Sequence, residues 1–259
     1  MTERDRSDVE TRREAILARA RAEGRVNVAE LAPELGIAVE TVRRDLKILA
    51  DRGVVRRVYG GAVAIETAGF ETDLDYRAAA DVTEKRRVAV AAAQRRHGAE
   101  TLYIDEGATP QFIAEALLGS GPMTVVTPSL PVATRLAGEP EVTLLLLGGR
   151  VRGRTQGTVD HWAVRMLGEL VIDLAYIGAN GISREHGVTT QDPAVAAVKR
   201  AALERSRRRI LFGAHTKFGA SSLCRFADLR DFEAVVTGVE LPAVEAHRYA
   251  ALGAPVLRV

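Results

Sequence analysis

The first fifty residues carry three short stripes of apolar residues at helical spacing, separated by charged and polar positions. The stripes are Ala15, Ile16, Leu17 and Ala20, then Val28, Leu31, Ala32 and Leu35, then Val42, Leu46 and Leu49. Residues three and four apart share one face of an α-helix, so each stripe predicts a helix that packs against the other two. Gly36 is placed to end the second helix.

The third predicted helix and the segment after it present polar residues away from this core. A strand-rich stretch follows the helix, and Gly60-Gly61 within it permits a tight turn. Two short helices, a basic third helix and a basic hairpin form the layout of a helix-turn-helix with a wing, which predicts binding to double-stranded DNA. The residues predicted to contact DNA are Thr41, Arg43, Arg44, Lys47, Arg56, Arg57 and Tyr59.

Charge alone would not support this interpretation. Residues 39–59 hold six basic and three acidic side chains, a net charge of +3, which also suits an ordinary solvated helix face. The order of helices, glycine turn and basic hairpin is more selective. An arginine there can contact phosphate or bond to guanine, so both backbone and base contacts fit. We therefore predict that residues 1–62 form a DNA-binding domain.

The rest of the chain predicts a different fold. Residues 63–80 show no sustained period and predict a linker to a second domain at 81–259. There, short apolar runs at 102–104, 124–127, 142–147, 174–177, 210–212 and 234–237 alternate with helical stretches at 111–118, 131–137, 163–170 and 194–205. This alternation predicts a Rossmann-like α/β domain with a mostly parallel sheet covered by helices.

Glycine-rich or polar loops follow almost every predicted strand. They cover residues 105–110, 127–129, 148–157, 178–182 and 215–219. One such loop is often only a tight turn, but loops at the carboxyl ends of parallel strands converge, and glycine lets backbone N–H groups approach a ligand. Five loops in these positions predict a small-molecule pocket.

Composition narrows the class of protein. The net charge is only +2, of which residues 1–62 contribute 13 basic and 11 acidic side chains, so the protein is not a generally basic nucleic-acid coat. Cys224 is the single cysteine, which excludes an internal disulfide and a cysteine-based zinc cluster. No run of about 18 apolar residues exists and the N-terminus is charged, so we expect a cytoplasmic protein without a membrane span.

The N-terminal motifs resemble those of the DeoR family of bacterial transcriptional regulators. That family carries V-S-x-x-T-I-R-R-D-L and R-x-H-G-G-A, where this chain has I-A-V-E-T-V-R-R-D-L and R-V-Y-G-G-A. The C-terminal part, to about residue 238, is similar to that family's sensor domain, which shares a fold with ribose-5-phosphate isomerase and CoA-transferases and typically senses phosphorylated sugars. The resemblance implies a repressor of a carbohydrate-use operon, released from its operator by a metabolite. One winged head covers only a short half-site, so we also expect a homo-oligomer.

The resemblance also implies which residues bind the effector. These are Asp105, Glu106, Gly107, Thr109, Thr127, Gly148, Gly149, Arg152, Gly178, Gly181, Lys199 and Lys217. Several family positions differ here: Ala38 replaces the serine before the recognition helix, Glu106, Ala108 and Pro128 alter the phosphate loops, and Ala214 and Gly238 replace aspartates. Glu106 adds negative charge near an anion site, so we expect weaker phosphosugar binding, with an unphosphorylated sugar or polyol as the alternative effector.

Lysine usage gives a further clue. The chain has 32 arginines and four lysines, Lys47, Lys85, Lys199 and Lys217. A lysine retained against this bias suggests a place where a compact ammonium suits better than a planar guanidinium. Chance survival of these four lysines on the surface would explain the same usage equally well.

Other candidate chemistry is weak, and we expect no catalytic residue, no cofactor and no metal. The histidines at 97, 161, 186, 215 and 247 show no metal-ligand spacing, and Ser129, Ser221 and Ser222 lack the setting of a nucleophile. An isomerase- or CoA-transferase-like enzyme with a DNA-binding head remains the alternative, although the acids missing at Ala214 and Gly238 and the lack of an obvious nucleophilic glutamate favour a regulator. A sensor that no longer binds phosphosugars is a third possibility.

Overall fold

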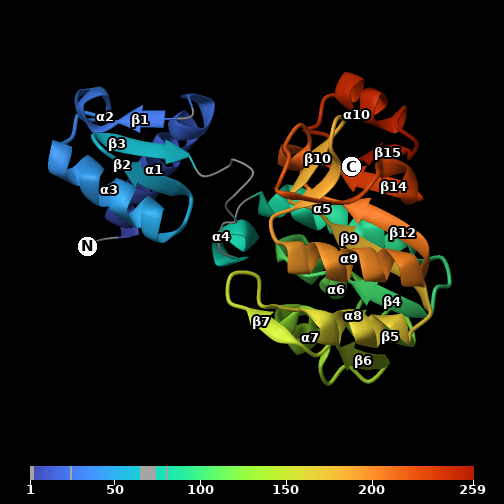
Figure 1. Ribbon diagram of the computed structural model, residues 1–259. Coiled ribbons are helices and arrows are strands. Elements are labelled where there is room, and N and C mark those ends of the chain that lie inside the picture. Colours follow the sequence, from blue (N-terminus) through green and yellow to red (C-terminus); the bar gives the residue numbers. More distant parts are fainter. Residues whose placement is uncertain (1–2, 24, 65–73, 80) are drawn as a thin grey trace. The chain divides into compact units, whose positions relative to one another are not determined.

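A computed structural model describes residues 3–23, 25–64, 74–79 and 81–259 of the chain (Figure 1). It divides into two compact units, residues 1–76 and 77–259, which are described separately. Of the predicted linker at 63–80, residues 65–73 and 80 lie outside the described residues. The remainder is regular rather than irregular, because Val63 and Ala64 end a strand and helix α4 spans Leu74–Ala79.

The first unit contains the three predicted helices and the predicted wing. The helices are α1 (Glu3–Glu23), α2 (Val28–Glu34) and α3 (Val39–Asp51), and the strands are β1 (Arg25–Asn27), β2 (Val55–Val58) and β3 (Gly61–Ala64). All three predicted stripes contribute to one core, led by Ile16, Leu31, Val42, Leu46 and Leu49. Strand β1, which was not predicted, pairs with β3 in the order β1-β3-β2.

Local chemistry sets the boundaries of these elements. The Asn27 side chain accepts a hydrogen bond from the Ala29 N–H at 2.9 Å and caps α2. Gly36 has a positive φ of 62°, which fits its predicted role at the end of that helix. Ala38 precedes α3 and makes no side-chain cap bond, as expected from the missing serine. At Gly61 a Cβ atom would lie 1.9 Å from the Val26 carbonyl oxygen, so the wing can approach β1 only with glycine there.

The second unit is built on a seven-stranded sheet in which every neighbouring pair is parallel. In spatial order the strands are β15 (Val256–Arg258), β14 (Ala234–Thr237), β12 (Ser206–Phe212), β9 (Ile172–Gly178), β4 (Thr101–Ile104), β5 (Met123–Thr127) and β6 (Val142–Leu146). This confirms the predicted α/β class. The chain adds strands outward from β4 in one direction and from β9 in the other, so the β4–β9 boundary is a topological switch point.

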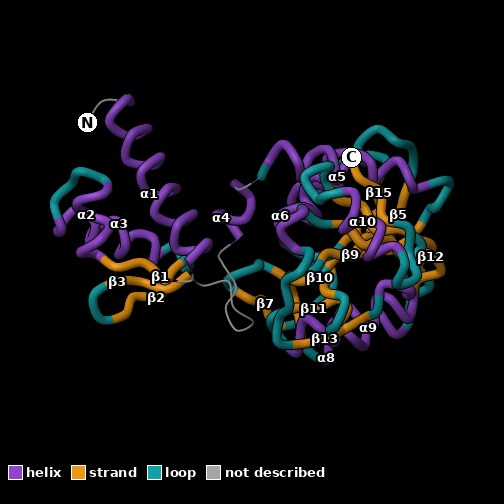
Figure 2. The backbone as a smooth tube through the Cα atoms, turned by 90° about the horizontal axis from the view of Figure 1, so that it is seen from above, coloured by secondary structure: helices purple, strands orange, loops and turns teal. Residues whose placement is uncertain are grey.

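Helices cover both faces of this sheet, as Figures 1 and 2 show. On one face α5 (Val82–Ala93), α6 (Ala108–Leu117) and α7 (Leu130–Leu136) enclose a core with Leu102, Ile104 and Val125. On the other, α8 (His161–Gly168), α9 (Pro193–Arg205) and α10 (Ala243–Ala250) enclose a core with Tyr103 and Val126. Successive residues of a strand therefore serve opposite layers, which explains why these strands are almost uniformly apolar.

Smaller elements complete the unit, and none of them was predicted. Strands β10 (Gly181–Ser183), β11 (Gly187–Thr190) and β13 (Cys224–Ala227) form an antiparallel sheet, and β7 (Arg150–Arg152) forms a hairpin with β8 (Gly157–Val159). Three short 3-10 turns lie at Gln94–Arg96, His215–Lys217 and Leu229–Asp231. No helix among the described residues has the length and apolar character needed to cross a membrane.

Candidate functional site

Helix α3 separates its apolar and basic residues onto opposite faces. Val42, Leu46 and Leu49 are buried in the core of the first unit. Arg43, Arg44 and Lys47 are exposed, while Thr41 is half-buried rather than fully turned to solvent. The exposed residues recur at three- and four-residue spacing, so their charges share one strip of the helix surface. The arrangement provides the cationic surface that contact with a phosphate backbone or guanine edge requires.

Asp45 lies in the middle of this basic helix but faces the opposite way. It is buried, and its carboxylate accepts hydrogen bonds from Arg12 Nε at 2.7 Å and from Arg13 Nε at 2.8 Å. Both arginines belong to α1, so this charge-assisted pair fixes the rotation of α3 relative to α1. Sequence reasoning missed this role. An acid one position before Leu46 and three after Val42 lies on the apolar face of a helix, and it needs a buried cationic partner.

The wing presents a second basic surface. Arg56 and Arg57 on β2 are exposed, and Tyr59 at the turn is 100% exposed. The Arg25 guanidinium donates a hydrogen bond to the Tyr59 carbonyl at 3.3 Å, so a third arginine lies beside the wing. Sequence reasoning missed Arg25 because its strand pairs with β3, thirty-odd residues away along the chain.

In the second unit, Asp105 and Lys199 meet at the switch point of the parallel sheet. Asp105 follows β4 and is 0% exposed, and Lys199 on α9 is 3% exposed. Their charged groups form an ion pair. The Gly178 N–H at the end of β9 donates to Asp105 Oδ2 at 2.8 Å, and the Lys199 ammonium donates to the Gly178 carbonyl at 3.1 Å. Three predicted effector residues are thus brought into direct contact.

Neighbouring groups complete this buried polar site. The Tyr103 hydroxyl donates to Asp105 Oδ1 at 3.4 Å, and burial together with the charges of Asp105 and Glu106 holds the pKa of that tyrosine well above its usual range. The Lys199 ammonium also lies 5.5 Å from the centre of the Phe226 ring. Lys199 is therefore held by a carboxylate, a backbone carbonyl and an aromatic ring in a buried site.

Glu106 points to different neighbours. A Cβ atom placed on Gly157 would lie 3.0 Å from the Glu106 Cβ and 3.1 Å from its Oε2, so this side chain packs against the β7–β8 hairpin. The hairpin also covers the start of α7, where the Leu130 N–H donates to the Gln156 carbonyl at 2.9 Å. Asp105 and Glu106 therefore do not face one reacting centre, as expected for adjacent residues at a strand end.

The other predicted effector residues lie on several different elements of the second unit. Gly107 is the N-cap of α6 with a φ of 127°, Thr109 and Thr127 are buried, and Gly181 packs against the Ala220 backbone. Arg152 forms an ion pair with Asp192 at 3.0 Å, next to the N-terminus of the helix that carries Lys199. Lys217 is half-buried in the turn after β12.

Gly148 and Gly149 line a separate shallow cavity. Its other lining residues are Arg150, Asp160, His161, Trp162 and Met166. The Gly148 N–H contacts the Met166 sulfur at 3.1 Å, and Trp162 is 56% exposed at the rim. Among the described residues, neither glycine is seen in contact with Asp105 or Lys199.

The lysines are not a random surface set. Lys85 and Lys199 are buried, so chance survival on the surface is wrong for these two. The Lys85 ammonium donates to the Arg77 carbonyl at 2.5 Å, and burial lowers its pKa. Only Lys47 of the four is exposed.

A glutamate from another part of the sequence lies beside the two positions that lack acids. Ala214 and Gly238 do lack carboxylates, but Glu84 on α5 lies beside both positions. Its carboxylate accepts the His215 N–H at 2.7 Å, and its Oε1 would lie 2.3 Å from a Cβ atom on Gly238. Sequence reasoning missed Glu84 because it lies on a helix more than a hundred residues before Ala214 and Gly238.

A winged helix-turn-helix joined to an α/β domain with a polar site at its switch point defines a DNA-binding regulator with a sensor domain. Two protein-family models match the chain accordingly: the DeoR-like helix-turn-helix domain matches residues 12–68, and the DeoR C terminal sensor domain matches residues 80–239. The chain belongs to the DeoR family of transcriptional regulators.

Curated relatives are similar to this chain over most of its length. The "Glycerol-3-phosphate regulon repressor" of Escherichia coli (strain K12) is 30% identical over 231 residues, 89% of this chain and 91% of the relative. The "Putative aga operon transcriptional repressor" of Escherichia coli O157:H7 is 30% identical over 234 residues, 90% of this chain and 87% of the relative. Among solved structures, ribose 5 phosphate isomerase A from Neisseria gonorrhoeae matches with a TM-score of 0.38 and 16% identity, covering 52% of this chain and 53% of that one.

Proposed function

We propose that this protein is a cytoplasmic repressor that binds an operator of a carbohydrate-utilisation operon and is released from it by a small polar effector. The observation that supports DNA binding is the exposed strip of Arg43, Arg44 and Lys47 on a helix whose Val42, Leu46 and Leu49 are buried in the core. The names of the relatives, which include repressors of a glycerol-3-phosphate regulon and of an aga operon, support the carbohydrate assignment.

The two basic surfaces take different parts in this proposal. Arg43 and Arg44 contact DNA from α3, supported by Thr41 and Lys47. Arg56, Arg57 and Tyr59 place the wing against the adjacent backbone. Arg43 starts from an ion pair with Glu40 at 3.3 Å, so it exchanges one anionic partner for another when DNA binds.

The effector binds at the switch point around the Asp105–Lys199 pair. These two charges satisfy each other in a buried site. An effector must offer groups that replace this pairing, because a buried charge left alone is costly. Hydroxyl groups can bond to Asp105 while an electronegative oxygen accepts from Lys199, which is the chemistry of a sugar or polyol with or without a phosphate.

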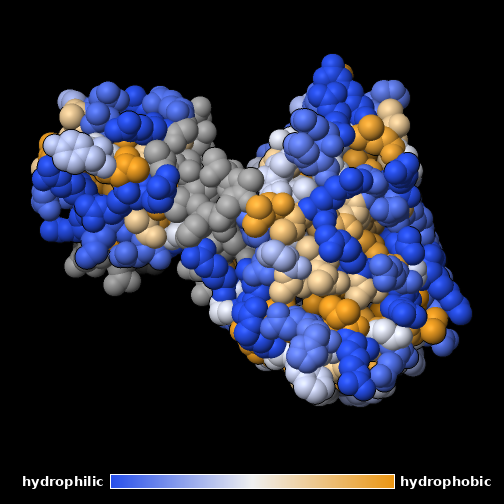
Figure 3. Space-filling view, in the orientation of Figure 1, coloured by the Kyte–Doolittle hydropathy of each residue, from blue (hydrophilic) through white to orange (hydrophobic). Residues whose placement is uncertain are grey.

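The unit of function is a homo-oligomer. One winged head covers a short half-site, and two-fold pairing supplies affinity and specificity. Strand β6 ends the described sheet, and Leu145 and Leu146 on it are exposed. Figure 3 shows apolar patches among the charged residues of the second unit's visible face. We place the contact with a second copy at the β6 edge. Strand β6 pairs with β5 on one side only, and an apolar strand with an open outer side favours association.

The test is binding of DNA from the promoter of the chain's own gene and of adjacent genes, measured by fluorescence anisotropy at fixed salt. Specific, salt-dependent binding that a sugar or sugar phosphate weakens supports the proposal. Equal affinity for promoter and unrelated DNA would contradict a sequence-specific regulator. Turnover of a pentose or hexosamine phosphate by the same preparation would favour the enzyme alternative.

A further inference from the structure

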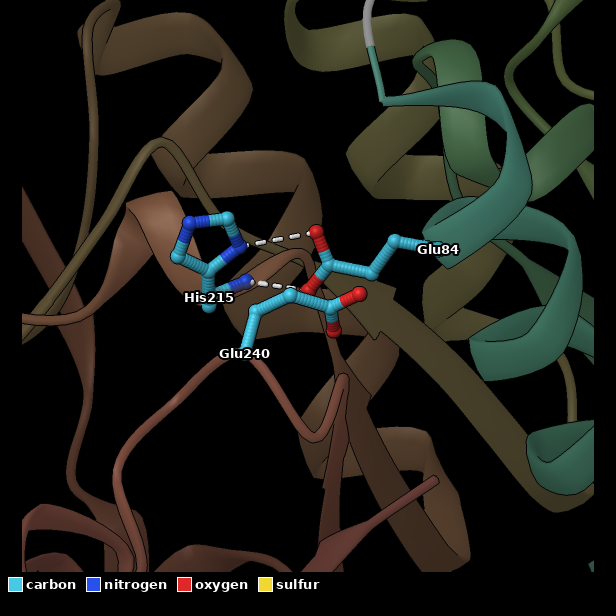
Figure 4. A group of neighbouring side chains, drawn as sticks. All are labelled: Glu84, His215 and Glu240. Atoms are coloured by element: carbon cyan, nitrogen blue, oxygen red, sulfur yellow. Dashed lines mark hydrogen bonds and ion pairs between the residues drawn. The ribbon is translucent and has the colours of Figure 1, made fainter.

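Three side chains from distant parts of the sequence converge at the carboxyl ends of β12 and β14 (Figure 4). Glu84 comes from the first turn of α5, His215 from the turn after β12, and Glu240 from the loop after β14. Each offers one donor atom, and these donor atoms all lie within 4.8 Å of one another. The cluster takes no part in the DNA surface or in the Asp105–Lys199 contact.

Glu84 and His215 hold each other in a fixed orientation. The His215 backbone N–H donates to Glu84 Oε1 at 2.7 Å, and His215 Nδ1 lies 2.8 Å from Glu84 Oε2. Glu84 is buried, so its carboxylate has few other directions available. The backbone bond orients one oxygen and directs the other toward the imidazole, as outer hydrogen bonds do for the ligands of a metal.

Gly238 explains how Glu240 joins this pair. A Cβ atom at this position would lie 2.1 Å from Glu240 Oε2 and 2.3 Å from Glu84 Oε1. The two carboxylates therefore approach each other across the bare backbone of a glycine, and any larger residue would displace them. The space that an aspartate side chain at this position would need is filled here by two other carboxylates.

The charges of the cluster call for a cation. Arg87 donates to both oxygens of Glu240, at 2.7 and 2.8 Å. Two carboxylates, those of Glu84 and Glu240, therefore share one guanidinium. Adjacent carboxylates repel, and a divalent ion between them would turn this repulsion into attraction.

We propose that Glu84, His215 and Glu240 bind one divalent first-row transition-metal cation, with Zn²⁺ as the best match. An imidazole nitrogen and two carboxylate oxygens form a mixed donor set that suits Zn²⁺, whereas Mg²⁺ and Ca²⁺ prefer oxygen alone. Ligand atoms about 2.0–2.2 Å from a tetrahedral ion lie roughly 3.3–3.6 Å apart. Glu84 Oε2 and His215 Nδ1 are 2.8 Å apart, so they would separate slightly when the ion replaces the proton between them.

Arg87 remains compatible with the bound ion. Glu240 can coordinate through one oxygen and keep Arg87 on the other, which makes the guanidinium an outer partner of the ligand. The ion would then join the start of α5 to the ends of β12 and β14, three segments that the sequence keeps far apart. The histidine spacing gave no sign of it because only one of the three ligands is a histidine.

The experiment measures metal binding by the full-length protein without a histidine tag. Zn²⁺ affinity and stoichiometry come from equilibrium dialysis, and Co²⁺ serves as a spectroscopic probe whose visible absorption reports the ligand set. The variants are Glu240→Gln and His215→Gln. His186→Gln is the matched control, since His186 is an exposed histidine 3.7 Å from Glu185 that belongs to no group of three donors among the described residues.

We expect one Zn²⁺ per chain and at least about a 10-fold loss of affinity in both ligand variants, with the control unchanged. The Co²⁺ spectrum of the unaltered protein should disappear in Glu240→Gln. Failure of the unaltered protein to bind Zn²⁺ or Co²⁺ would overturn the proposal. Binding that survives Glu240→Gln, an exposed position whose variant keeps its circular dichroism spectrum, would overturn it equally. Operator binding is measured separately, so either result leaves the proposed function to its own test.

Discussion

The Asp45 carboxylate on α3 accepts a hydrogen bond from Arg13 Nε on α1 at 2.8 Å, and the acid is buried while its helix neighbour Arg44 is exposed. The R-R-D run of the motif therefore has two functions within three residues. Its arginines belong to the exposed cationic strip, and its aspartate bonds to α1 on the opposite side of the helix. This contact determines which residues of α3 face solvent.

Replacing Asp45 with alanine should destabilise the first unit by about 1–3 kcal/mol, because two arginines lose their acceptor while remaining partly exposed. Asp51→Ala in the same helix is the matched control, since Asp51 is exposed, and its change should stay within about 0.5 kcal/mol. Urea unfolding measures both. Equal stability of the two variants would show that the Arg12 and Arg13 contacts do not hold α3 in place.

Alanine at both Arg43 and Arg44 should abolish most of the specific operator affinity. Arg44 alone should lose about 1–3 kcal/mol if it reads a base, and Arg43 less, because removing it also releases Glu40 from an ion pair. Gel shift at fixed salt compares both with Arg207→Ala, an exposed arginine of the second unit that should have no effect. Unaltered affinity of the double variant would contradict the assignment of α3 as the recognition helix.

Sequence patterns identified the helices with a clear apolar stripe and the strands that are continuous apolar runs. The strands β4, β5, β9 and β12 are flanked by helices on both faces and read as apolar runs, so they were predicted. Strands β10, β11 and β13 were not, because each is short and is defined only by pairing with distant partners. Helix α5 was missed because an alanine-rich segment with buried Glu84 and Lys85 has no clear apolar stripe.

The same distinction applies to the sites. Arg43 and Arg44 were predicted because a single helix presents them. Asp105 and Lys199 were both predicted to bind the effector, but their contact with each other was not predicted, since 94 positions separate the two residues. The pairing of Glu84 with His215 joins residues 131 positions apart and no local pattern could indicate it.

Asp105 and Lys199 should be energetically coupled. Asp105→Asn or Lys199→Met alone leaves one buried charge without its partner and should cost about 3–5 kcal/mol of stability. The double variant removes both charges and should lose less than the sum of the two, which a double-mutant cycle by chemical unfolding measures. Additive losses would mean that the pair does not form in solution. All three variants should lose the response of DNA binding to the effector.

Association of the chain should depend on the β6 edge. A lysine in place of Leu146 puts a charge on the exposed apolar strand and should shift the protein toward monomer, with weaker binding to a two-half-site operator. Val244→Lys on α10 is the control, because Val244 is also an exposed apolar residue but lies on a different element. Light scattering at micromolar concentration gives the mass. A monomeric unaltered protein, or a Leu146 variant of unchanged mass, would contradict this surface.

Glu106 should determine how well this sensor accepts a phosphate group. Its side chain packs against Gly157 directly before the N-cap of α6, where a helix N-terminus would otherwise attract an anion. At about 4 Å and an effective dielectric near 20, two like charges repel by roughly 4 kcal/mol, and only nearby cations such as Lys199 can offset part of this. Calorimetry with phosphosugars and the matching free sugars should therefore show preference for the free sugar.

Glu106→Ser should restore phosphosugar binding, whereas Glu185→Ser, which removes an exposed acid elsewhere, should not. Micromolar phosphosugar binding by the unaltered protein that Glu106→Ser leaves unchanged would show that this carboxylate does not repel the ligand.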